Sequence, residues 1–179
     1  FDLNKPSIQW VLLFFLAFVW GSSFILMKKG LLSYSPEQVA SLRILISFLF
    51  LSPIIVQNFI KIKKDQWWRV FVAGLLGSGI PAFLFPLAQT HISSSLTGML
   101  NSLVPLFTVV VGLLFFKLNF RWLKFAGVIV GLIGALGLLT TTGDISFNNQ
   151  EVLYGGFVVL ATICYAVNIN FIKRFLSDR

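Results

Sequence analysis

The chain is 179 residues long, with 57% hydrophobic residues and only 11% charged residues. About a quarter of the residues in a typical soluble domain are charged, so this composition excludes a soluble domain. The formal net charge of +8 would suit a nucleic-acid partner, but the cations lie at the ends of apolar segments and not in one basic region with interleaved aromatic residues. We therefore expect no nucleic-acid binding.

The apolar segments are long enough to cross a lipid bilayer. A transmembrane helix needs about 20 mostly apolar residues to cross a hydrocarbon core of about 30 Å. Helices satisfy their own backbone hydrogen bonds there, and the sequence lacks the alternation of transmembrane strands. Helices are predicted over residues 9–30, 36–57, 66–89, 93–116, 120–140 and 151–175. The sequence thus predicts an all-α integral membrane protein with six transmembrane helices.

The predicted helix at 9–30 lies close to the N-terminus, as a secretion signal would. No small-residue cleavage site follows it and further spans come after it, so we interpret it as a retained helix. The chain begins with Phe1 and ends soon after its last helix, which suggests a partial reading frame.

The second predicted helix contains Arg43, the one cation well inside a span. Pro36 suits the first turn of this helix, and Glu37 suits its positive N-terminal dipole. Arg43 could extend to the interface, pair with Glu37, or attract an anionic or zwitterionic solute. We favour a structural role narrowly and keep Arg43 and Glu37 as candidates for gating or electrostatic steering.

The third predicted helix carries a small and polar stripe and two prolines, Pro81 and Pro86, which predict a bend. Such bends expose backbone carbonyls in transporters, but they also serve packing alone, and the sequence favours neither interpretation. The stripe at steps of 4, 3, 4 and 4 consists of Gly74, Ser78, Pro81, Phe85 and Gln89.

The fourth predicted helix carries the most informative pattern, a stripe with steps of 3, 4, 4, 3 and 4. Its members are Ser94, Thr97, Asn101, Pro105, Thr108 and Gly112. Polar groups in hydrocarbon need a partner or water, so this face should line a helix contact or a hydrated cavity. The two interpretations are balanced for the hydroxyls, whereas a pathway is favoured for Asn101, whose carbonyl loses its helical partner at Pro105.

Orientation follows from the distribution of Lys and Arg between the two sides. With a cytoplasmic N-terminus, every Lys and Arg except Lys28, Lys29 and Arg43 lies on the cytoplasmic side. We therefore predict that the N-terminus is cytoplasmic.

A shift of 145 residues aligns Trp20-Gly21 with Tyr165-Ala166, and Ser23 with Asn168. Such aromatic and small pairs are common in membrane helices, so coincidence is a fair alternative. The predicted topology makes the last helix cross the membrane in the direction opposite to the first, which is the arrangement of an inverted repeat.

Three segments together resemble the EamA family of the drug/metabolite transporter superfamily. They are W-G-S-S-F at 20–24, S-L-R-I-L at 41–45 and L-V-P-L-F at 103–107. The resemblance implies one five-helix repeat at 1–145 and the first helix of a second, inverted repeat at 146–179. One departure is Lys117, where the family usually has a glutamate.

Members of that family are typically ten-helix carriers of the bacterial inner membrane that move amino acids, related metabolites or drugs. The resemblance implies that Trp20, Ser22, Ser23, Tyr165 and Asn168 line the pathway, together with the stripes of the third and fourth helices. It also implies a partner for this chain, either the remaining four helices of the second repeat or another copy.

We therefore predict a secondary transporter that exports small metabolites, such as amino acids or drug-like solutes, by alternating access. The expected partners are a small-molecule solute and the lipid bilayer, and no cofactor is expected. One alternative is a half-size assembly subunit without independent transport. A membrane-embedded enzyme is disfavoured, because His91 lies in a loop, Cys164 is the only cysteine and no acid lies well inside a span.

Overall fold

The structure is a computed structural model that describes residues 5–59, 63–116, 122, 125–127, 129–131, 133–134 and 149–176. These residues are all-helical, without a strand, as predicted. Five helical spans are long and apolar enough to cross a membrane: Pro6–Gly30, Pro36–Asn58, Lys64–Gln89, Ser94–Phe116 and Asn149–Phe175. The predicted helix at 120–140 lies outside the continuously described residues.

The first two spans are the helices α1 (Pro6–Gly30) and α2 (Pro36–Phe59), joined by a short turn. Proline is favoured in the first turn of a helix, and α1 begins there, three residues earlier than predicted. Before α2, the Ser35 hydroxyl accepts from the Gln38 N–H at 3.3 Å while the Gln38 side chain accepts from the Ser35 N–H at 2.9 Å. This reciprocal capping box fixes the start of α2.

The third span is continuous but changes its helical type along its length. It comprises η1 (Lys64–Gln66), α3 (Trp67–Gly74), the π-helical segment η2 (Leu75–Gly79) and α4 (Ile80–Gln89). The Ile80 N–H bonds to the Leu75 carbonyl, five residues back. Pro81 has no N–H to donate to the Gly77 carbonyl, so the α-helical ladder is interrupted where the π segment stands.

The fourth span is broken into α5 (Ser94–Asn101) and α6 (Val104–Phe116). Ser93 caps α5, since its hydroxyl accepts from the Leu96 N–H at 3.1 Å. The break precedes Pro105, which cannot donate to the Asn101 carbonyl. The sequence predicted a proline break in a single helix, and the structure places it at residues 102–103.

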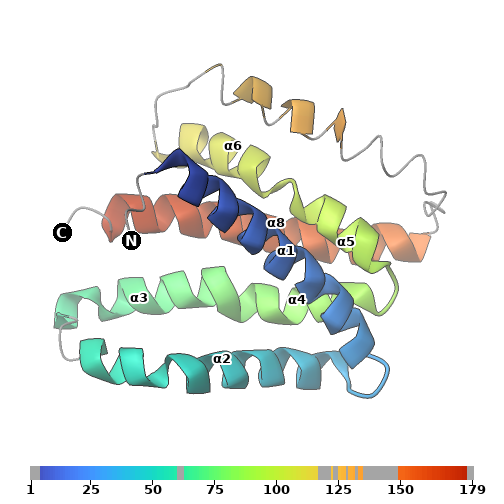
Figure 1. Cartoon of the computed structure of the whole chain (residues 1–179), viewed down its shortest axis with the longest axis horizontal. Helices are drawn as coiled ribbons and strands as arrows, with labels where there is room; N and C mark the ends of the chain where they lie inside the picture. Colours follow the sequence, from blue (N-terminus) through green and yellow to red (C-terminus); the bar gives the residue numbers. More distant parts are fainter. Residues whose placement is uncertain are drawn as a thin grey trace.

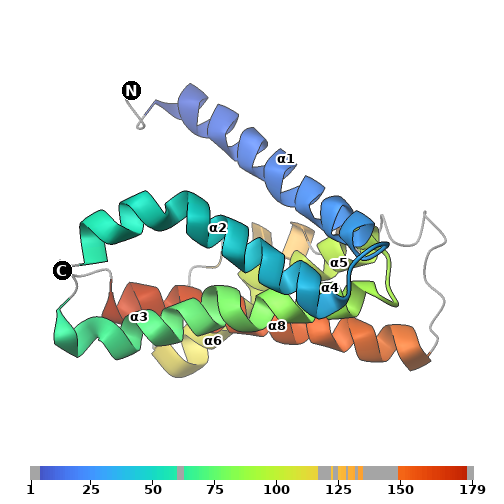
Figure 2. The same ribbon diagram turned by 90° about the horizontal axis from the view of Figure 1, so that it is seen from below.

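The last described span, α8 (Asn149–Phe175), runs opposite to α1 and packs against α3, α4, α5 and α6 (Figure 1). We call the end where α1 and α4 finish and α2, α5 and α8 begin the packed end. The opposite end, where α1 and α3 begin and α2, α6 and α8 finish, is the splayed end. In Figure 2, α1 rises away from the other helices toward the splayed end.

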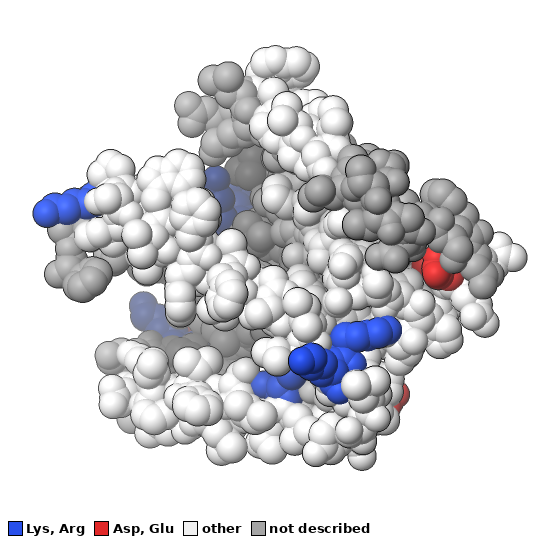
Figure 3. Space-filling view, turned by 45° about the vertical axis from the view of Figure 1, so that its right-hand side comes forward, with Lys and Arg blue, Asp and Glu red and all other residues white. Residues whose placement is uncertain are grey.

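The hydrophobic core lies at the packed end. Its buried cluster consists of Phe24, Met27, Val39, Phe85, Ala88, Ile92, Val158 and Ala161. By contrast, every side chain of α1 from residue 11 to 21 is exposed, as is nearly all of α2 beyond Ala40. Figure 3 shows that the visible described surface carries few charged side chains, with Lys and Arg gathered in a few places. This apolar exterior is what a membrane-embedded bundle requires.

Candidate functional site

A cavity of about 200 Å³ lies between α2, the third span and α8. It is lined by Arg43, Ile44, Ser47, Gly77, Ser78, Ala82 and Tyr165. Three of the candidates chosen from sequence, Arg43, Ser78 and Tyr165, therefore meet in one place although they are far apart in the chain. We call this the Arg43 cavity.

The α2 wall of the Arg43 cavity follows from helical spacing. Residues three and four apart share a helix face, so Arg43 and Ser47 point in the same direction. That face is turned toward α4, against which α2 packs. The result is a guanidinium and a hydroxyl on one side of a cavity that lies within apolar spans.

The opposite wall depends on the π-helical segment η2. Gly77 and Ser78 both belong to it and both line the cavity. A Cβ added to Gly77 would lie 2.2 Å from Nδ2 of Asn168, so only glycine leaves room for that amide. The π turn thus brings Gly77 directly against α8, and π turns are frequently found at functional sites.

Asn168 packs behind Gly77 with part of its amide unsatisfied. Its Oδ1 atom is buried and has no hydrogen-bond partner among the described residues. A buried polar atom without a partner is costly, so this oxygen is an available acceptor for water or a ligand. Asn168, chosen from the repeat alignment, therefore adjoins the Arg43 cavity through Gly77.

Arg43 does not pair with Glu37 in the structure. Its Nη1 atom donates to Sδ of Met27 at 3.7 Å, and Oε2 of Glu37 instead accepts from the Ser35 hydroxyl at 2.7 Å. A thioether is only a weak acceptor. The guanidinium therefore faces the cavity with most of its hydrogen-bonding capacity unused by the described residues.

Tyr165 forms the α8 side of the cavity and is fixed by aromatic packing. Its ring stacks on Phe85, with centroids 5.9 Å apart and an interplanar angle of 27°. Phe85 in turn contacts Phe24 at 5.6 Å. The cavity is thereby joined to the core of the packed end.

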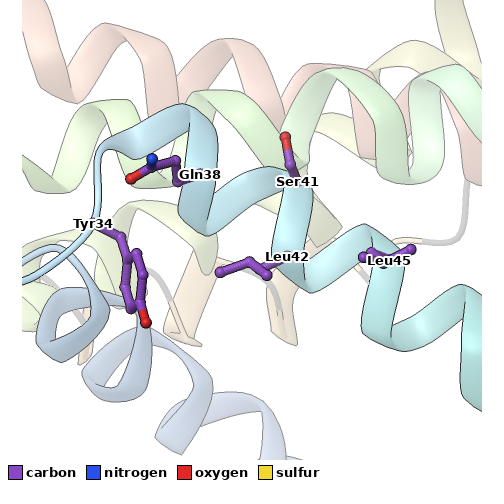
Figure 4. A pocket seen from close by; sticks show the side chains of 5 residues that line it. All are labelled: Tyr34, Gln38, Ser41, Leu42 and Leu45. Atoms are coloured by element: carbon purple, nitrogen blue, oxygen red, sulfur yellow. The ribbon is translucent and has the colours of Figure 1, made fainter.

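A second cavity, of about 450 Å³, lies on α2 beside the turn from α1 (Figure 4). Tyr34, Gln38, Ser41, Leu42 and Leu45 line it. The Gln38 side-chain oxygen is already engaged by the Ser35 N–H, which leaves the walls mainly apolar. The sequence did not indicate this groove.

Several other candidates make hydrogen bonds within their own helices. The hydroxyls of Ser22 and Ser23 donate to the carbonyls of Val19 and Trp20, at 3.0 and 2.6 Å. The Thr97 hydroxyl donates to the Ser93 carbonyl at 2.8 Å and is fully buried. None of these three hydroxyls lines either cavity described above.

The remaining candidates divide between buried and exposed positions. Gln89 is fully buried with both side-chain polar atoms unpartnered among the described residues, and Oδ1 of Asn101 is also buried without a partner. Trp20 and Pro105 are exposed. The structure thus places some pathway candidates at the Arg43 cavity and leaves the others apart from it.

Sequence reasoning missed Ser47, Gly77 and Asn170. Ser47 could have been found from its spacing to Arg43. Asn170 is buried and bridges two helices, donating from Nδ2 to the carbonyls of Thr108 and Ala166, both at 2.9 Å. Asn170 could have been found because it is a polar residue in an apolar helix. Nothing in the sequence reveals that Gly77 lies against α8.

Comparison with known proteins gives a family and several relatives. A model of the EamA-like transporter family matches residues 8–140. An uncharacterized transporter of Archaeoglobus fulgidus is 26% identical over 94% of this chain and 59% of its own length. The uncharacterized transporter YdfC of Bacillus subtilis is 26% identical over 89% of this chain and 51% of its own.

A probable amino-acid metabolite efflux pump of Salmonella typhimurium is 27% identical, over 89% of this chain and 51% of its own length. The chain thus spans about half the length of the curated relatives it matches. No solved structure gives a significant match.

Proposed function

The chain belongs to the EamA-like transporter family, and on that premise we propose that the protein is a secondary transporter that exports small metabolites, such as amino acids or drug-like solutes, by alternating access. It is an integral multi-pass membrane protein, with five described apolar spans. The single observation that carries the proposal is the Arg43 cavity, a pocket with a partly polar lining between helices that are otherwise apolar.

The cavity has the properties that a solute site in a membrane needs. A guanidinium and three hydroxyls, those of Ser47, Ser78 and Tyr165, face a space inside the bundle. Ionisable groups inside a membrane mark substrate pathways because they are costly to keep there. A π-helical turn within a span, such as the one in the third span, is also frequent at functional sites.

The packing of α8 supports the proposed inverted repeat. It runs opposite to α1 and contacts every helical piece from α3 to α6. We propose that the first helix of the second repeat is inserted among the helices of the first. Rocking of one repeat on the other would then change access to the Arg43 cavity.

The exposed part of α1 supports a further partner. Its large apolar side chains from Val11 to Trp20 are between 41 and 75% exposed. We propose that the remaining four helices of the second repeat, or another copy of the chain, cover part of this surface. We also propose a cytoplasmic N-terminus in a bacterial inner membrane, which would place the packed end on the outer side.

The same exposed surface favours the second candidate, an assembly subunit that does not transport alone. The two functions differ in what the purified protein does in liposomes. The protein expressed from its complete reading frame should be reconstituted and loaded with unlabelled solute, and uptake of labelled amino acids and metabolites should be followed by counterflow. Uptake above empty liposomes supports transport, and no uptake across a broad panel would refute it.

A further inference from the structure

Arg43 is the residue whose environment the proposed function leaves unexplained. It lies about two turns inside α2, and the hydrogen bond that the structure gives its guanidinium goes to the thioether of Met27. A guanidinium has five N–H donors, and a thioether is a weak acceptor. Such a group in an apolar span is stable when an anion or strong acceptors meet it.

Among the residues that the structure describes, no carboxylate lines the cavity that Arg43 faces. Its other lining residues are three hydroxyl-bearing side chains, a glycine and two apolar side chains. Glu37, the acid nearest in sequence, accepts from Ser35 and does not line the cavity. The described lining therefore provides no anion to balance the charge of the Arg43 guanidinium and accept its hydrogen bonds.

The cavity also limits what kind of anion fits. A single guanidinium matches a single carboxylate, which it can bind with two parallel hydrogen bonds. Phosphorylated solutes carry more charge and usually meet several converging cations, whereas the described lining has one. Ile44 and Ala82 add apolar walls suited to a small hydrocarbon side chain.

From these observations, and resting on the proposed function, we infer that Arg43 binds the carboxylate of the transported solute, with the hydroxyls of Ser47, Ser78 and Tyr165 around it. The solute class is small monocarboxylates with an apolar portion, including neutral amino acids. Arg43 is thus the residue that determines specificity for an acid over its uncharged derivatives.

The first test uses the wild-type protein and pairs of ligands that differ only at the carboxyl group. L-leucine, L-phenylalanine and L-threonine are each compared with their primary amides as competitors of counterflow in liposomes. Loss of a hydrogen-bonded charge pair should weaken competition by about 10- to 100-fold. Equal competition by acid and amide would overturn the inference.

The second test changes the protein. In Arg43→Gln, the apparent KM for the acid should rise about 10- to 100-fold while competition by the amide stays unchanged. Arg43→Lys keeps the charge but loses the planar fork, so it should restore only part of the affinity. The control Lys29→Gln removes one exposed cation at the end of α1. It should change neither the apparent KM for the acid nor the competition by the amide. An equal loss for acid and amide in Arg43→Gln would contradict carboxylate binding.

A binding measurement separates failure of this inference from failure of the proposed function. Thermal unfolding of the detergent-solubilised wild-type protein is followed with each acid and each amide at increasing concentration. Stabilisation by acids alone supports the carboxylate site even if liposomes show no transport, in which case only the proposed function fails. If no carboxylate stabilises the protein, or if amides stabilise it equally, the inference is wrong.

Discussion

The packed and splayed ends of the bundle are held together by different kinds of contact. At the packed end, buried side chains from α1, α2, α4 and α8 form one apolar cluster. There, Nζ of Lys28 donates to the carbonyls of Gln89 and Ile92, and His91 stacks on Tyr154 with centroids 3.8 Å apart. These contacts tie α1, α4 and α8 together.

At the splayed end, α8 packs against α6, where Nδ2 of Asn170 donates to the Thr108 carbonyl, and against α3 through contacts that lie nearer the surface. Trp68 meets Phe171 edge-on at 6.0 Å, and the Arg69 guanidinium lies 5.6 Å from the Trp68 ring and 6.0 Å from the Phe175 ring. The neighbouring halves of α1 and α2 are exposed. A change in access would therefore break the fewest buried contacts if it began with the exposed halves of α1 and α2 at the splayed end.

The largest expected effect is the loss of a core aromatic ring at the packed end. Phe85→Ala should destabilise the protein by about 3 kcal/mol, because Phe85 is only 3% exposed and contacts Phe24 and Tyr165. The matched control is Phe15→Ala in the splayed half of α1, where the ring is 62% exposed and the cost should be about 0.5 kcal/mol or less. Unfolding in detergent measures both, and equal losses would erase the distinction between the ends.

The next effect tests the polar tie at the packed end. Lys28→Met should cost about 2 kcal/mol, because two carbonyls lose a charged donor. Lys29→Met removes the same charge from an exposed side chain and should cost little. The thermal midpoints of the two variants provide the measurement. A smaller loss for Lys28→Met than for Lys29→Met would show that this tie does not hold α1 to α4.

A smaller effect is expected at the midpoint, where the third span meets α8. Gly77→Ala should cost about 1 kcal/mol, because its Cβ would displace the Asn168 amide. Gly74→Ala, with open space around the added Cβ, should be neutral or slightly stabilising. In an Asn168→Ala background the cost at Gly77 should vanish, and unfolding measurements on this double-mutant cycle would test the contact. If Gly77→Ala still destabilises the protein in the Asn168→Ala background, the contact with Asn168 is not the cause of the destabilisation.

The smallest effect is expected at the splayed end. Arg69→Gln removes two cation–π contacts and a hydrogen bond at 3.4 Å to the Phe175 carbonyl. It should cost about 0.5–1 kcal/mol in detergent unfolding. Lys64→Gln, an exposed neighbour, serves as the control. A loss for Arg69→Gln as large as that for Phe85→Ala would mean that the splayed end is as firmly held as the packed end.

Much of the fold could be predicted because the lipid environment constrains it strongly. Apolar length located the five described spans, and the prolines and caps located most of their ends to within a few residues. The helix predicted at 120–140 is not tested by the described residues. The π segment was not predicted, because Pro81 indicates that the helix bends but not which helical turn becomes irregular.

The π segment also explains why the predicted stripe of the third span divides. Pro81, Phe85 and Gln89 are buried, whereas Gly74 and Ser78 are exposed. A wider turn shifts the helical phase between the two groups, so residues spaced for one α-helical face no longer share it. Arg43, Ser78 and Tyr165 could be chosen as polar or aromatic candidates, but their meeting in one cavity depends on this turn and on the packing of α8.

The position of α8 also has a consequence for the order in which the chain can fold. Val158 and Ala161 of α8 complete the buried cluster formed by α1, α2 and α4. During synthesis, those earlier helices leave the ribosome before α8. The side chains that Val158 and Ala161 cover in the folded protein therefore stay uncovered until residues 149–175 have been made and inserted. The proposed five-helix repeat and the set of helices that packs into one core therefore have different boundaries.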